Sequence, residues 1–169
     1  MPTVEELPAA ASRVEMTQMV LPPDTNMHGT LFGGRLLQWI DICGAIAAQR
    51  HCRTKVVTAS MDDMHFSVPI QEGDVVILWA TVNYVHRSSM EVGVRVEREA
   101  PLTGERVHAA TSYLTYVALD ESGKPHPIPK VRAETPGERR RYNDAITRRE
   151  FRLARRAAMD ARQALEGEG

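Results

Sequence analysis

The spacing of hydrophobic residues changes along this chain and separates one helical segment from several strands. Arg13 to Val20 lacks a helical repeat and is predicted to be a strand. The prolines in Leu21-Pro22-Pro23-Asp24 end it, because proline fixes φ and has no amide hydrogen. A loop of residues 25–32 and the pair Gly33-Gly34 lead into a long predicted helix. Its apolar residues cover a wide part of its circumference, so much of the helix surface is expected to be buried. Its residues at helical spacing are Leu36, Leu37, Ile40, Cys43, Gly44, Ala47 and Ala48.

Four segments of β character follow this helix: Lys55 to Phe66, Asp74 to His86, Ser89 to Glu99 and Arg106 to Leu119. Apolar and polar residues alternate strictly in the third segment, which predicts one face on a core and the other in water. The second segment is apolar on both faces, as expected for a central strand. The connections are short and rich in turn-forming residues, which favours antiparallel hairpins: Gln71 to Gly73, Arg87 to Ser88 and Pro101 to Gly104.

The order of these elements predicts an α+β fold with a single domain over residues 13–132. An antiparallel sheet of about five strands is expected to curl around the central helix and hide its apolar side chains. Three prolines between Gly123 and Pro129 mark the end of this domain. Residues 133–169 are therefore interpreted as a C-terminal extension.

The extension is predicted to form a helix. Thr135-Pro136-Gly137-Glu138 has the spacing of a capping box with proline at the first helical position, and the helix should reach about Leu165. Nine arginines interspersed with acids lie within it. We favour an amphipathic helix packed on the domain or on a neighbouring subunit through Tyr142, Ile146 and Leu153, with nucleic-acid binding as the alternative.

Composition narrows the class of protein further. The formal net charge is -1 and 25% of the 169 residues are charged, so no overall basic surface for nucleic acid or anionic membranes is expected. Only Cys43 and Cys52 are present, without a zinc-finger pattern, so neither a disulfide framework nor a metal site is predicted. The acidic residues Glu5 and Glu6 and the lack of a long apolar run favour a cytoplasmic protein without membrane insertion.

Asp41 is the first candidate for chemistry, because aspartate is a poor residue for the middle of a helix and its charge opposes burial. On the helical wheel it lies at the edge of the apolar face of the predicted helix, beside small residues that leave room for a ligand. The alternative left open by spacing alone is a surface aspartate in solvent or paired with Arg50 or Lys55.

Gly33 and Gly34 form the second candidate, since a glycine-rich helix start exposes amide hydrogens and the positive end of the helix dipole. Such an end can stabilise an oxyanion. Asp41 lies about 12 Å further along a straight helix, too far to act on the same carbonyl. If both are used, one site must combine two subunits, so the sequence predicts a dimer.

The segment Thr25 to Gly34, followed by Leu37 and Asp41, resembles the N-x-x-G-x-x-F-G-G…D signature of hot-dog acyl-CoA thioesterases of the cytosolic acyl-CoA hydrolase type. The resemblance covers roughly residues 14–132. His28 and Thr30 depart from it, because many bacterial relatives have asparagine and an acidic residue there. Agreement continues in four further motifs: Met64 to Phe66, Gly73 to Val76, Arg87 to Val92 and Gly123 to Pro129.

The resemblance implies an acyl-CoA substrate and no cofactor, with coenzyme A as part of the substrate. It implies dimers that pair sheets edge to edge, often three dimers in a hexamer, with active sites between subunits. Asp41 would be general base or nucleophile, Asn26 would position water or substrate, and the amides near Gly33 and Gly34 would hold the carbonyl oxygen. The remaining residues implied for coenzyme A are His65 and Phe66 beside the pantetheine arm, and Arg87, Ser88 and Ser89 at the nucleotide.

Two other functions are weighed against hydrolysis. A hot-dog dehydratase or hydratase needs a histidine on or near the central helix, and none lies between Phe32 and Arg50. A non-catalytic acyl-CoA sensor would keep the same pocket and signal through the arginine-rich extension. The presence of Asp41, Asn26 and the glycine pair together favours a catalytic site over a non-catalytic one. Acyl chain length and nucleotide regulation are not determined by the sequence.

Overall fold

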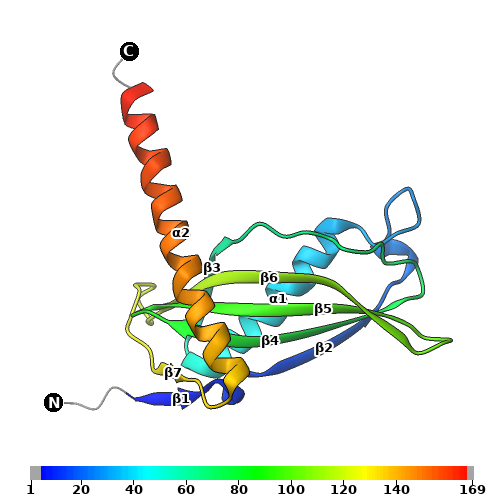
Figure 1. The fold of residues 1–169 in the computed structure, drawn as a ribbon, viewed down its shortest axis with the longest axis horizontal. Helices are drawn as coiled ribbons and strands as arrows, with labels where there is room; N and C mark the ends of the chain where they lie inside the picture. The colour runs from blue at the N-terminus through cyan, green and yellow to red at the C-terminus, as the bar shows by residue number, and fades with distance from the viewer. Residues whose placement is uncertain (1–4, 167–169) are drawn as a thin grey trace.

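The computed structural model describes residues 5–166; residues 1–4 and the predicted end of the extension, 167–169, lie outside this part. A five-stranded sheet faces the long helix α1 (Gly33–Cys52) on one side and the second helix, α2 (Pro136–Glu166), on the other (Figure 1). The other elements are β1 (Glu6–Pro8), the 3-10 helix η1 (Ala9–Ser12), β2 (Val14–Met19), the 3-10 helix η2 (Pro22–Asp24), β3 (Lys55–Met61), β4 (Val75–Val85), β5 (Ser89–Ala100), β6 (Glu105–Leu119) and β7 (Lys130–Arg132).

The large sheet is antiparallel, with strand order β2-β4-β5-β6-β3, which confirms the predicted α+β fold and both long hairpins. β5 is the middle strand, and the apolar β4 lies between it and β2. Each of three strands contains one extra residue relative to its partner: Ala59, Asn83 and Ala109. Such bulges bend strands and increase twist. They explain how the sheet curls around α1.

The main core lies between the concave face of the sheet and α1. Every second residue of β5 from Met90 to Val96 is buried there, which confirms the predicted alternation. Trp39, which the helical pattern did not single out, is buried, whereas Leu37 is only half buried. α1 ends at Cys52 and is capped by the next residue, Arg53, whose left-handed φ is 57° and whose amide donates to Gln49 O.

The outer face of the sheet is only partly exposed to solvent. The prediction that the polar residues of β5 lie in water was wrong for Glu91. Glu91 is only 2% exposed, although Arg95 on the same face is exposed. α2 crosses the sheet over Glu91, then projects beyond it (Figure 1). A strand pattern alone does not reveal a cover supplied by a helix distant in sequence.

The start of α2 is fixed as its sequence predicted. Thr135 Oγ1 accepts from the Glu138 amide at 3.2 Å and Glu138 Oε2 accepts from the Thr135 amide at 3.0 Å, which completes a capping box. Arg13 binds Glu138 at 2.8 Å. Tyr142 meets the ring of Tyr84 edge-on.

In the far half of α2, Leu153, which was expected to pack on the domain or on a neighbouring subunit, is 49% exposed in the protomer. A short parallel pair of β1 with β7 was also not predicted, since three-residue strands carry too little pattern. Within residues 5–166, no helix is both long and apolar enough to cross a membrane.

His51 at the end of α1 makes stability depend on pH. Its Nε2 lies 2.9 Å from Pro129 O, and burial lowers the pKa of its imidazole while this hydrogen bond opposes the shift. The folded protein therefore keeps His51 neutral, whereas the unfolded chain takes up a proton below its ordinary pKa of 6.5. The contribution of neutral His51 to the free energy of unfolding is therefore fully present above that pH. It falls as the pH decreases, by no more than about 1.4 kcal/mol per pH unit.

We expect His51→Gln, which can still donate to Pro129 O but does not titrate, to flatten this dependence. Urea unfolding at pH 7.5, 6.5 and 5.5 measures it for both proteins. Parallel stability curves would show that another group causes the acid sensitivity.

Candidate active site

Asp41 lies on the face of α1 that meets β3 and β6, where two hydroxyl groups bind it. Thr58 donates to Asp41 Oδ1 at 2.7 Å, and Tyr116 donates to the same oxygen at 3.1 Å and to Asp41 O at 2.8 Å. Strand register aligns the two donors, because Thr58 and Tyr116 are paired residues of β3 and β6. The open alternative of an ion pair with Arg50 or Lys55 is not what the structure shows.

The second carboxylate oxygen of Asp41, Oδ2, is not held by the two hydroxyl groups that bind Oδ1. Among residues 5–166, no hydrogen-bond donor is found for Asp41 Oδ2, and the side chain is only half buried. A carboxylate anchored through one oxygen keeps its orientation while the other oxygen remains available to accept a proton or attack a carbon. This arrangement suits a general base or a nucleophile.

Neighbouring groups are less suited to such chemistry. Burial, reinforced by the Asp41 charge, raises the pKa of Tyr116, so this phenol stays protonated and remains a donor. Burial raises the pKa of the Cys43 thiol to about 11, which leaves it a poor nucleophile. His51, the histidine of α1, is buried against Pro129 and does not form the pair that a dehydratase needs.

Gly44 makes room for Tyr116. A methyl group at Gly44 would lie 2.5 Å from the Tyr116 hydroxyl, which is already bound to Asp41. We expect Gly44→Ala to lower stability by about 1–3 kcal/mol, since the buried ring must move. It should also lower kcat, because Asp41 loses a donor.

Thermal unfolding and steady-state kinetics test this pair of effects. Gly137→Ala in α2 is the control, because a methyl group there meets only Arg141 at an ordinary 3.5 Å. Equal unfolding temperatures of Gly44→Ala and the wild type would contradict the expected clash.

The start of α1 offers free donors. In the described part of the chain, neither the Gly33 amide nor the Gly34 amide has a hydrogen-bond acceptor. Phe66 lies over this helix end, 3.6 Å from where a Cβ of Gly33 would be. A cavity of about 330 Å³ opens there, lined by residues that include Gly33, Leu36 and Phe66. The structure thus brings together two of the candidate site residues, Gly33 and Phe66.

Asn26 and His65 are placed differently from Phe66. Asn26 Oδ1 accepts from the His28 amide at 2.9 Å and Asn26 Nδ2 donates to Thr30 at 2.9 Å, so its amide orders the loop before α1. His65 is exposed and, within residues 5–166, makes no hydrogen bond. His65 lies in the last part of the predicted strand Lys55 to Phe66, and here the prediction was wrong: β3 stops at Met61 and Asp62 to Phe66 are irregular.

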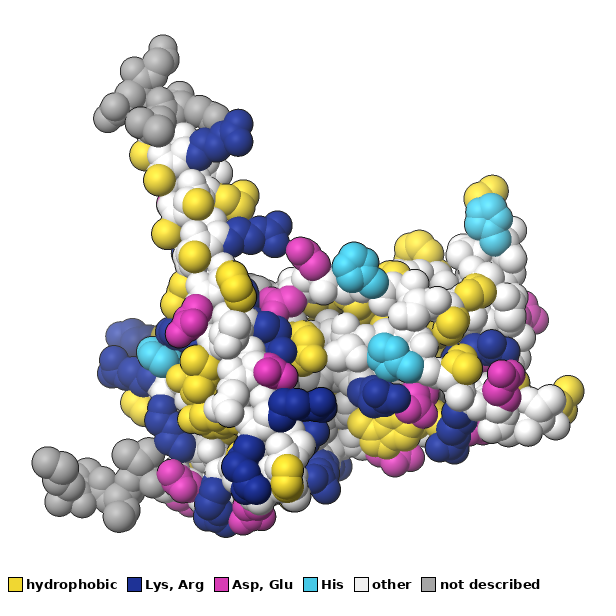
Figure 2. Space-filling model, in the orientation of Figure 1, with side chains coloured by type: hydrophobic (Ala, Val, Ile, Leu, Met, Phe, Trp, Pro, Cys, Tyr) yellow, Lys and Arg dark blue, Asp and Glu magenta, His cyan; other side chains and the backbone are white. Residues whose placement is uncertain are grey.

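Arg87 and Ser88 lie in the turn between β4 and β5, with the Arg87 side chain exposed, and Ser89 is the first residue of β5. Lys130 donates to the carbonyl oxygens of Val85 and His86 at this turn. Burial lowers the pKa of His86, and the positive charges of Arg149, Lys130 and Arg87 lower it further. Figure 2 shows Lys and Arg side chains gathered where α2 meets the sheet. The turn therefore lies in a positive field suited to phosphate.

Sequence reasoning missed Thr58 and Tyr116. Neither belongs to a motif, and only the pairing of β3 with β6 across α1 makes them partners of Asp41. A polar residue in the middle of an apolar strand is a weak signal for such a contact. Within residues 5–166, no group of three or more His, Cys, Asp or Glu side chains is arranged to bind a metal.

Comparison with known proteins gives a consistent family. Residues 28–105 match the family model described as Thioesterase superfamily. An uncharacterized acyl-CoA thioester hydrolase of Bacillus subtilis is 50% identical over 145 residues, which cover 86% of this chain and 84% of the relative. A structure of an apo-hexameric acyl-CoA thioesterase is 45% identical with a TM-score of 0.88, covering 91% of this chain and 99% of that one.

The acyl-CoA hydrolase of Staphylococcus aureus, solved with butyryl coenzyme A and coenzyme A, is 40% identical with a TM-score of 0.86 over 95% of this chain and 97% of that one. Structures of that enzyme include variants with alanine in place of an aspartate, an asparagine and a threonine. Fold and sequence agree on one assignment: the chain belongs to the hot-dog family of acyl-CoA thioester hydrolases.

Proposed function

We propose that this protein hydrolyses acyl-CoA thioesters to a free acid and coenzyme A, with Asp41 as general base or nucleophile. The observation that carries the proposal is the one-sided anchoring of Asp41, whose Oδ1 is held by Thr58 and Tyr116 while Oδ2 faces no donor in the described chain. As base, Asp41 takes a proton from water as the water oxygen bonds to the thioester carbon. The C–S bond then breaks and the sulfur leaves as coenzyme A thiolate, which is protonated.

The carbonyl oxygen gains negative charge in this step and needs donors. The free amides of Gly33 and Gly34 at the helix start fit this need. They lie about 12 Å along the helix from Asp41, so we propose that they act on the substrate held by the partner's Asp41. Asn26 would shape the loop that leads to these amides.

A shared site requires that β3 meets a second protomer. β3 is an edge strand of the sheet and its residues are mostly exposed, including Val57 at 46%. An exposed edge carrying an apolar side chain is a pairing surface. We therefore propose a dimer through the two β3 edges, which brings each Asp41 near the other subunit, and the hexameric relative supports further assembly into three dimers.

Coenzyme A recognition is proposed at the Arg87–Ser89 turn, where the positive field of Arg87, Lys130 and Arg149 would bind phosphates. The asparagine, aspartate and threonine replaced in the Staphylococcus aureus enzyme follow one another at the same intervals as Asn26, Asp41 and Thr58. This agreement supports a common site of three residues.

Release of free coenzyme A from a panel of short to long acyl-CoAs, measured with a thiol reagent, tests the function. We expect turnover for at least one chain length, and the panel reveals which. Binding of acyl-CoA without release at any chain length would overturn the hydrolase and favour an acyl-CoA sensor.

A further inference from the structure

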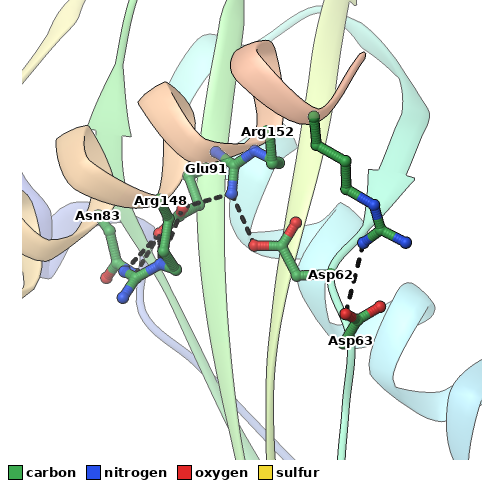
Figure 3. Close-up of polar contacts among 7 residues, drawn as sticks. Asp62, Asp63, Asn83, Glu91, Arg148 and Arg152 are labelled. Carbon is green, nitrogen blue, oxygen red and sulfur yellow. Dashed lines mark hydrogen bonds and ion pairs between the residues drawn. The ribbon is translucent and has the colours of Figure 1, made fainter. Parts of the chain in front are cut away.

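Helix α2 carries a row of arginines at helical spacing along one side, and they face carboxylates of β5 and of the segment that follows β3 (Figure 3). Arg148 binds Glu91 at 2.8 Å and stacks on the Tyr113 ring at 3.6 Å. Arg155 lies 3.4 Å from Asp63, and both side chains of this pair are largely exposed. Along this row the contacts change from a largely buried ion pair at Arg148 to a solvent-exposed ion pair at Arg155.

Arg152 occupies the middle of the row and joins two acids. Its Nη1 lies 2.7 Å from Asp62 Oδ2 and 3.1 Å from Glu91 Oε2. Glu91 also accepts from Asn83 Nδ2 at 3.2 Å, so its buried carboxylate has several donors. Charge-assisted contacts of this kind are directional, and here they tie α2 to the chain that leaves β3.

Asp62 is the first residue after β3, and it lies four positions from both Thr58 and Phe66. The irregular segment Asp62 to Phe66 is held at its start by the Asp62 amide on Tyr113 O at 2.9 Å. Its next backbone tie is Ser67 N to Ala109 O at 2.8 Å. Besides this backbone hydrogen bond to β6, the first residue of the segment has a side-chain contact with α2, from Asp62 to Arg152.

We infer that Arg152 is a positioning residue for substrate binding, because it holds Asp62 midway between Thr58, which orients Asp41, and Phe66, which covers the helix start. The inference rests on the proposed function and deepens it. It makes α2 part of the substrate site, although α2 lies on the opposite face of the sheet from α1 (Figure 1).

Arg152→Met tests this, since it keeps the aliphatic stem and removes the charge. We expect KM for acyl-CoA to rise roughly fivefold with a smaller change in kcat, because the groups at Asp41 remain while the segment over the substrate loosens. Arg155→Met removes the same charge one turn away from an exposed pair and should leave KM unchanged. Asp62→Asn should reproduce the Arg152→Met effect, and the double variant should add little more.

Hydrogen exchange provides a readout that does not need turnover. Amides of residues 62–66 should exchange faster in Arg152→Met than in Arg155→Met, while amides of α1 stay equally protected. An unchanged KM with only a lower unfolding temperature, or faster exchange everywhere, would overturn the positioning role. Failure of the wild type to release coenzyme A would instead overturn the function, and the exchange result would still decide whether Arg152 holds the segment.

Discussion

We expect Asp41→Asn to lower kcat for coenzyme A release by about 10²–10⁴-fold and to leave the affinity for coenzyme A unchanged. Asparagine keeps the shape of the side chain, and its oxygen can still accept from Thr58 and Tyr116. The amide in place of Oδ2 can neither accept a proton nor attack carbon. Steady-state kinetics give kcat, and titration calorimetry with coenzyme A gives the affinity.

Asp63→Asn is the matched control, because it removes one carboxylate whose side chain is 82% exposed and which only meets Arg155. Its kcat should equal that of the wild type. A fully active Asp41→Asn enzyme would exclude Asp41 as base or nucleophile, whatever the effect on binding.

We expect Gly33→Pro to lower kcat by about 10²-fold, because it removes the amide hydrogen that we assign to the oxyanion. Proline is well tolerated at the first position of a helix, and the preceding Phe32 has the extended φ of -65° and ψ of 126° that proline favours. Space is available, since a Cβ at Gly33 meets Phe66 at 3.6 Å. Gly33→Ala keeps the amide hydrogen and should remain close to wild-type activity.

The same variant tests whether two protomers share a site. Co-expressed Gly33→Pro and Asp41→Asn chains form mixed dimers in which one site combines both changes and the other has neither. Random pairing should then restore about a quarter of wild-type activity, although each variant alone is nearly inactive. If mixing restores nothing, the helix start and Asp41 do not act across a two-fold axis.

Much of the fold could be predicted because its signals are local. The alternation from Met90 to Val96, the turn residues around Gly104 and the capping box at Thr135 each depend on neighbours in sequence, and the structure confirms them. Asp41 was recognisable because a charge on the margin of a buried helix is unusual.

The parts that failed depend on distant segments. Glu91 looks like a surface residue until α2, more than fifty residues later, places Arg148 over it. Thr58 becomes a partner of Asp41 only through the pairing of β3 with β6, which lies far along the chain. β3 ends early at Met61, and the next residue, Asp62, contacts Arg152, which no local pattern encodes.

The place of α1 in the chain has a consequence for biosynthesis. This helix precedes β4, β5 and β6, the strands whose inner faces bury it. During synthesis the apolar side chains of α1 therefore leave the ribosome before the strands that bury them have been made. The incomplete chain exposes an apolar surface that is prone to aggregation. Because the closing contacts are long-range, folding must be slow relative to helix formation. Synthesis of this enzyme should consequently depend on chaperones more than its modest size suggests.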